Sequence, residues 1–140
     1  MAGDVLHLIG TALFGLLIVF TILFGFAYAT RKTYMPHHAE AAGKRWEELD
    51  ARMQWLARTY VNALGGGCVA VGALCVGLLA IHVQQPQQLA VISLAIGLAL
   101  HWGYIGFMAW RLQRATGANT RWRVSIMVLA LTLIATALSW

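Results

Sequence analysis

The chain has 140 residues, of which 60% are hydrophobic and only 11% are charged. A soluble domain usually carries roughly 25% charged residues, so this composition excludes an ordinary water-soluble domain and makes the bilayer the expected solvent. The length fits a single domain. No phosphate-binding glycine loop, zinc-finger spacing or metalloprotease motif occurs in the sequence, and we expect no nucleic-acid partner.

The first apolar run covers residues 5–30 and contains no charged side chain. It is long enough to cross a hydrocarbon core of about 30 Å. A secretory signal would need a basic start and a small-residue cleavage site, so we expect a retained helix. The Met35-Pro36 pair disfavours helical backbone, which predicts that this helix ends near Thr33.

Three further apolar runs follow at residues 62–83, 89–110 and 121–140. They predict an all-α integral membrane protein whose single domain is a bundle of four transmembrane helices. The polar segments at residues 31–61 and 111–120 are the expected cytoplasmic loops. Helical character should resume near His38 in the first of them. Apolar residues from Trp46 to Leu64 recur every three or four positions, so the second span is expected to begin with a cytoplasmic helical extension.

The cations give the expected orientation. Six of the ten Lys and Arg lie in the first polar segment and four lie around the second, at Arg111, Arg114, Arg121 and Arg123. By the positive-inside rule, both segments are cytoplasmic and both termini lie outside. We expect this topology in a bacterial inner (cytoplasmic) membrane.

Small residues form two stripes along the second span. In lipid, such stripes let helix backbones approach closely, which predicts tight packing and a homo-oligomer. The first stripe comprises Ala70, Ala73, Gly77 and Ala80, and the second comprises Cys68, Gly72 and Cys75. The two cysteines are about 10 Å apart on a helix, too far for a disulfide.

The start of the second span carries a family resemblance. Arg52, Arg58, Asn62 and Leu64 occur in an order that resembles the MAPEG superfamily, the membrane-associated proteins in eicosanoid and glutathione metabolism. The succession of spans and loops is also similar. The resemblance implies a trimer that binds glutathione between subunits and transfers it to lipophilic substrates.

A second match lies just before the last span, where Asn119-Thr-Arg121 is similar to an Asn-Arg that such proteins often carry there. The chain departs from the family pattern at two places. Gly65 stands where the family has a glutamate, and the third span has no arginine. The only polar candidates at that second place are His101 and Tyr104.

The main candidate site is an anion pocket at the cytoplasmic mouth of the bundle. Arginine forks suit carboxylates and phosphates, such as those of glutathione or a lipid headgroup. The alternative is that these arginines serve topology alone, while Asn62 makes a helix-to-helix hydrogen bond. The candidate residues are Arg58, Asn62, Arg111, Arg114, Arg121 and Arg123.

His101 lies near the middle of the third span, where an ionisable side chain suggests a proton relay or a metal ligand. The alternative is a neutral histidine that hydrogen-bonds to a neighbouring helix. Tyr104 is one turn away on the same face. These two residues are the candidates for catalysis, with Tyr104 stabilising a thiolate.

The other histidines suggest less. His7 and His82 are expected at one depth near the outer face, so they are the candidates for a haem in an electron-transfer membrane protein. His37 and His38 are adjacent and point in different directions on a helix, so we expect solvated loop histidines rather than a shared metal.

Two main readings of function remain open. In one, the protein is MAPEG-like, takes an amphiphilic substrate from the lipid bilayer and holds an anionic or thiol group at the inner arginines. In the other, it is a non-catalytic accessory or scaffold subunit of a membrane complex. Arg58 and Asn62 are the residues expected to matter most in the first reading.

Overall fold

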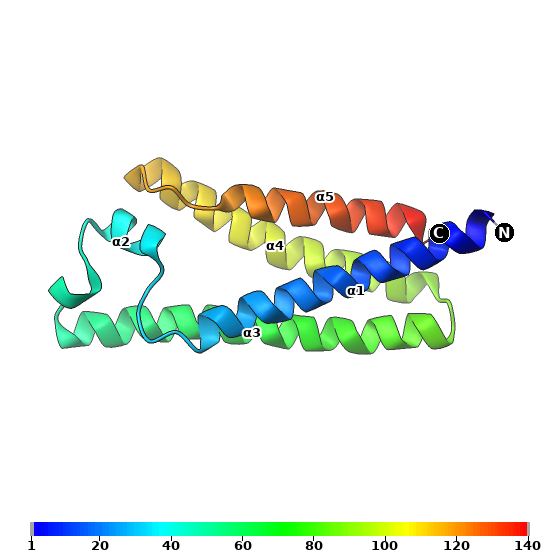
Figure 1. The fold of residues 1–140 in the computed structure, drawn as a ribbon, viewed down its shortest axis with the longest axis horizontal. Helices are drawn as coiled ribbons and strands as arrows, with labels where there is room; N and C mark the ends of the chain where they lie inside the picture. Colours follow the sequence, from blue (N-terminus) through cyan, green and yellow to red (C-terminus); the bar gives the residue numbers. More distant parts are fainter. Residues whose placement is uncertain (1, 140) are drawn as a thin grey trace.

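The computed structural model describes residues 2–139, with side chains described from residue 3, and these residues contain helices and no strands. Figure 1 shows long helices running side by side, with shorter helical pieces at one end. The elements in chain order are α1 (Ala2–Ala29), α2 (Pro36–Ala42), the 3-10 turn η1 (Trp46–Glu48), α3 (Ala51–Gln84), α4 (Gln88–Thr116) and α5 (Trp122–Leu138).

Three of these helices, α1, α3 and α4, are long and apolar enough to cross a membrane. α5 is also apolar, but it has only 17 residues. The expected helical extension of the second span is confirmed as a helix, because α3 begins at Ala51 and continues to Gln84 without a break. Its start is set by Asp50, whose carboxylate accepts a hydrogen bond of 2.9 Å from the backbone nitrogen of Met53.

Several helix boundaries differ from the sequence expectations. α1 ends at Ala29 instead of near Thr33. α4 continues beyond residue 110 to Thr116, because no helix-breaking residue precedes Gly117. Gly43 ends α2 with a φ of 62°, a backbone conformation that glycine adopts at low cost.

Glycines bring the helices into close contact. A side chain at Gly65 of α3 would overlap the backbone of Ala29 and reach within 2.5 Å of the carbonyl oxygen of Gly25, so α1 and α3 approach backbone to backbone here. At the other end of α1, a side chain at Gly10 would meet the carbonyl oxygen of Ala135 in α5 at 2.8 Å. These contacts give the close helix packing that small residues allow in lipid.

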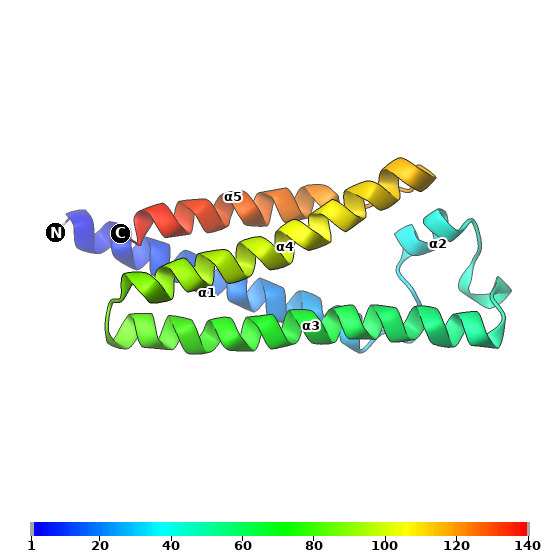
Figure 2. The same ribbon diagram turned by 180° about the vertical axis from the view of Figure 1, so that it is seen from behind.

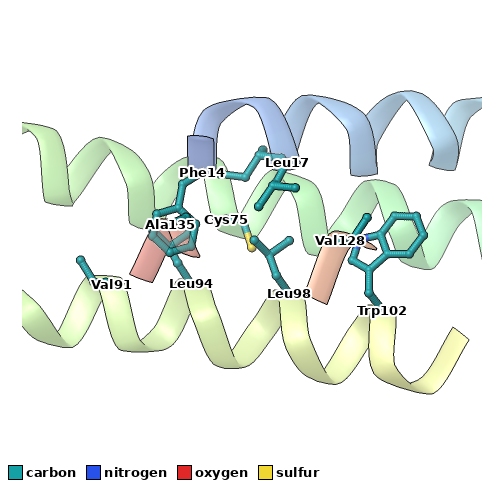
Figure 3. Close-up of a cluster of buried hydrophobic side chains, with 10 residues drawn as sticks. Phe14, Leu17, Cys75, Val91, Leu94, Leu98, Trp102, Val128 and Ala135 are labelled. Atoms are coloured by element: carbon teal, nitrogen blue, oxygen red, sulfur yellow. The ribbon is translucent and has the colours of Figure 1, made fainter. Parts of the chain in front are cut away.

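The apolar core lies where α1, α3, α4 and α5 meet, and Figure 3 shows its side chains pointing toward one another from these helices. Trp102 of α4 belongs to this core and is only 1% exposed. Its indole nitrogen donates a 3.0 Å hydrogen bond to the hydroxyl of Thr21 in α1. The buried indole nitrogen therefore has the partner that such a group needs.

The two ends of the bundle differ. Both termini and the turn between α3 and α4 lie at one end, while α2, η1 and the connection from α4 to α5 lie at the other (Figure 1). α3 and α4 diverge toward that second end, as the reverse view in Figure 2 also shows. All ten Lys and Arg belong to segments at the second end.

Candidate functional site

A polar hollow of about 280 Å³ lies between the end of α4 and the start of α5. It brings two of the candidate arginines, Arg121 and Arg123, into one cavity. The N-terminus of α5 opens here, and the first N–H groups of a helix have no intrahelical partner and favour anions. The full lining is Gln113, Asn119, Thr120, Arg121, Trp122, Arg123 and Val124.

Local hydrogen bonds hold the wall of this hollow. The hydroxyl of Thr120 contacts the carbonyl oxygen of Ala109 at 2.8 Å and the side-chain oxygen of Gln113 at 3.1 Å. Both partners belong to α4, so these contacts hold the segment between α4 and α5 against the end of α4. The backbone nitrogen of Asn119 donates to the carboxylate of Glu40 in α2 at 2.9 Å. α2 therefore helps to position the loop that carries Arg121.

An apolar groove of about 440 Å³ adjoins the hollow along the α4–α5 seam, and Trp122 lines both. Its lining includes Gly106, where a Cβ would come within 2.7 Å of the Cβ of Ser125, so α4 and α5 are in close contact there, and Gly103, where nothing lies within 4 Å of a Cβ. The groove is lined by Gly103, Gly106, Phe107, Trp110, Trp122, Ser125, Ile126 and Leu129. An anion-favouring cavity and an apolar groove thus lie next to each other, with Trp122 in the lining of both.

The remaining two arginines of α4 lie beside the groove and stack on aromatic rings. The guanidinium carbon of Arg114 is 4.7 Å from the centre of the Trp110 ring, and that of Arg111 is 5.9 Å from the Phe107 ring. Cation–π contacts of this kind orient guanidinium groups. The two rings that these arginines contact, Phe107 and Trp110, therefore also line the apolar groove.

Arg58 and Asn62 lie elsewhere. They belong to α3, which diverges from α4 at this end of the bundle, and neither lines the hollow (Figure 2). With its nitrogen turned toward α1, the Asn62 amide donates to the carbonyl oxygens of Tyr28 and Arg31, both at 3.1 Å. Asn62 therefore binds one carbonyl group in the last turn of α1, that of Tyr28, and one just beyond the helix, that of Arg31. The guanidinium carbon of Arg58 lies 5.9 Å from the ring of Trp55 on its own helix.

His101 contacts Cys68 and not Tyr104, the partner that we expected. Tyr104 is 66% exposed and has no hydrogen bond to His101 in the described chain. Instead, Nε2 of His101 lies 3.2 Å from the sulfur of Cys68 on α3. Cys68 was expected only as a packing residue, and no local signal in the sequence pairs it with His101, because the contact depends on how α3 and α4 are rotated about their axes.

His7 and His82, in contrast, do come together. Their ring centres are 4.9 Å apart at the end of the bundle that carries the termini. His37 and His38 also have their rings in contact, at 4.3 Å, on the short helix α2. No group of three or more His, Cys, Asp or Glu residues able to hold a metal ion occurs within residues 2–139.

The environment of α2 lowers the pKa of both its histidines. Burial, followed by the neighbouring His37 and by Arg31, lowers the pKa of His38 from 6.5 to about 4. Burial is also the main cause that lowers the pKa of His37. These rings are therefore neutral at physiological pH and partly buried, whereas we expected solvated histidines.

The fold thus defines an all-helical protein with three helices long and apolar enough to cross a membrane, and with its cations gathered at one end. No known protein family, curated protein or solved structure matches the chain.

Proposed function

We propose that this chain is an integral membrane protein with four spans, with α2 and the α4–α5 connection on the cytoplasmic side. The cation distribution supports this orientation. α5 is about 26 Å long at 1.5 Å per residue, slightly less than a hydrocarbon core of about 30 Å. Its packing against α4 and α1 supports a fourth crossing at the same depth as theirs.

Within that membrane, we propose that the protein binds an anionic lipid at the α4–α5 seam. The observation that carries this proposal is that Trp122 lines both the hollow that contains Arg121 and Arg123 and the apolar groove, so the two are neighbours. A phosphate group at the arginines would form charge-assisted hydrogen bonds. An acyl chain in the groove would remove apolar surface from contact with other lipids and fix the orientation of the headgroup.

Glutathione is the other anion that this hollow suits chemically, through its two carboxylates. The MAPEG resemblance motivates that choice, but Asn62 and Gly65 are both occupied with the packing of α1. We therefore favour a lipid over a glutathione transferase. Glutathione nevertheless belongs in the test, because it would use the same two arginines.

The test measures the melting temperature of detergent-purified protein with phosphatidylglycerol, with phosphatidylcholine and with glutathione. We expect phosphatidylglycerol to raise the melting temperature, since a ligand that binds only the folded state stabilises it. Phosphatidylcholine should raise it less. The effect of phosphatidylglycerol should disappear in the double variant Arg121→Gln, Arg123→Gln.

The matched control is Lys44→Gln, Arg52→Gln, which removes the same charge from exposed positions outside the hollow. It should keep the response to phosphatidylglycerol. Equal responses to the two lipids, or an unchanged response in the arginine variant, would contradict the lipid proposal. A rise with glutathione alone that depends on Arg121 and Arg123 would replace the lipid with a glutathione site.

A further inference from the structure

Two histidines from different helices meet at the end of the bundle opposite to the arginines. His7 of α1 and His82 of α3 have ring centres 4.9 Å apart and ring planes inclined by 49°. His82 is 2% exposed, and neither of its ring nitrogens has a hydrogen-bond partner among residues 2–139. The backbone of Gln87 lies near the ring without forming a hydrogen bond of normal geometry. Buried polar atoms are nearly always paired, so this ring calls for a partner.

The tautomer of His7 follows from its contact with the end of α5. Nδ1 of His7 lies 3.2 Å from the backbone carbonyl oxygen of Ser139. A carbonyl oxygen only accepts, so the hydrogen bond places a proton on Nδ1 and leaves a lone pair on Nε2. Metal-binding histidines are held in this way, with one ring nitrogen bound to a carbonyl and the other free for the metal.

The spacing of the rings distinguishes between two kinds of metal site. A metal–nitrogen bond of about 2.0–2.1 Å puts each ring centre about 3 Å from the ion, so two ligands at a tetrahedral angle have ring centres about 5 Å apart. Two axial ligands on opposite faces of a haem would need ring centres about 6 Å apart. The observed 4.9 Å fits the first arrangement and leaves no room for a haem between the rings.

We propose that His7 and His82 form a binding site for a divalent transition-metal ion that favours imidazole nitrogen, with Zn²⁺ as the probe. Asp4, one turn before His7 on α1, adds negative charge to this end of the bundle. With two histidine ligands, a tetrahedral ion has two further coordination positions, which water molecules would fill. The bound ion joins α1 to α3, and the contact with Ser139 extends this link to α5.

The experiment titrates Zn²⁺ into the full-length protein, purified without a histidine tag, and follows both the heat of binding and the melting temperature. We expect one ion per chain and a higher melting temperature, with no comparable effect of Mg²⁺. His7→Gln and His82→Gln should each weaken Zn²⁺ binding at least about tenfold. Loss of a residue that only supports a metal ligand already weakens metal binding about 10–100-fold, and these variants remove a ligand itself. His7→Gln is the more informative variant, because His7 is only partly buried and its loss should leave the fold intact.

Two variants test other possible ligands. The double variant His37→Gln, His38→Gln removes the other contacting histidine pair, and Cys68→Ser removes the sulfur that faces His101. Both should keep the affinity of the unmodified protein for Zn²⁺. The proposal is overturned if the unmodified protein does not bind Zn²⁺, if His7→Gln binds it equally well, or if Cys68→Ser abolishes binding.

Discussion

Gly65 determines how closely α1 approaches α3. A Cβ at this position would overlap the backbone nitrogen of Ala29, so no side chain fits unless the helices separate. The glutamate of the MAPEG pattern would therefore require a different placement of α1. The sequence shows that Gly65 departs from the family pattern, but the cause lies in a contact between helices that are distant in the sequence.

We expect Gly65→Ala to lower the free energy of unfolding by about 1–3 kcal/mol, as overpacking of a tight interior does. The measurement is unfolding of the purified protein in detergent by heat or by a denaturing detergent. Gly66→Ala is the matched control, because nothing lies within 4 Å of a Cβ there. Similar stability of the two variants would show that α1 does not contact α3 as described.

His38 provides a test at acidic pH. Burial, with His37 and Arg31, lowers its pKa from 6.5 in the unfolded chain to about 4. The unfolded chain thus binds more protons between these values, so the contribution of His38 to stability is complete above pH 6.5 and decreases as the pH falls toward 4. A histidine NMR titration should show His38 still neutral at pH 5. A pKa near 6.5 would mean that the ring is solvated, and His38→Gln assigns the signal.

At the scale of the helices, the start of α3 depends on one cap. The carboxylate of Asp50 accepts from the backbone nitrogen of Met53, and the eleven residues 51–61 extend α3 beyond the span expected at 62–83. We expect Asp50→Ala to weaken this first turn by about 1 kcal/mol. Amide hydrogen exchange should then become faster at residues 51–54, whereas Asp50→Asn should keep the protection. Unchanged exchange in Asp50→Ala would show that the cap does not matter.

The sequence was sufficient to predict the positions of the long helices, because their signals are local. The uncharged run at residues 5–30 and the helical pattern from Trp46 to Leu64 both depend on neighbouring residues alone. The pattern began too early, because Trp46 lies in η1 and α3 begins at Ala51. The end of α1 was less predictable. Asn62, more than thirty residues away in the sequence, donates to the carbonyl oxygens of Tyr28 and Arg31 on either side of this end.

The candidate site was predicted in part. The sequence places Arg58 and Arg121 at the same end of the bundle, but it does not show that α3 and α4 diverge there. Only the structure assigns Arg121 and Arg123 to one hollow and gives Asn62 to the packing of α1. The contact of His101 with Cys68 likewise depends on the rotation of two helices, which mean hydropathy does not reveal.

At the scale of the whole molecule, the bundle has two chemically different ends and, along α3, an exposed face of small residues. The buried stripe of the second span, Cys68, Gly72 and Cys75, packs inside the bundle. The other stripe is exposed along α3, at Ala70, Ala73, Gly77 and Ala80. The homo-oligomer, a trimer by the MAPEG resemblance, stays a prediction. This exposed face of α3 is the surface through which we expect the subunits to pack.

The topology can be tested with single cysteines, because Cys68 and Cys75 are buried and replaceable by alanine. In intact cells, a maleimide that does not cross membranes should label Gln85→Cys, in the turn between α3 and α4. Lys44→Cys and Arg114→Cys should react only after the cells are opened, since both lie at the opposite end, which we propose to be cytoplasmic. The reverse pattern would invert the orientation, and labelling of all three from outside would rule out crossings by α3 and α4.

The contact of Gly10 with Ala135 and Ser139 affects the order in which the molecule assembles. A ribosome makes α1 first and α5 last. The N-terminal half of α1 therefore has no contact with α5 until the rest of the chain has been made. Pairing of α1 with α3 can occur earlier. The bundle is therefore completed only after α5 has been made, and a chain released before residue 135 would leave the N-terminal half of α1 without this contact.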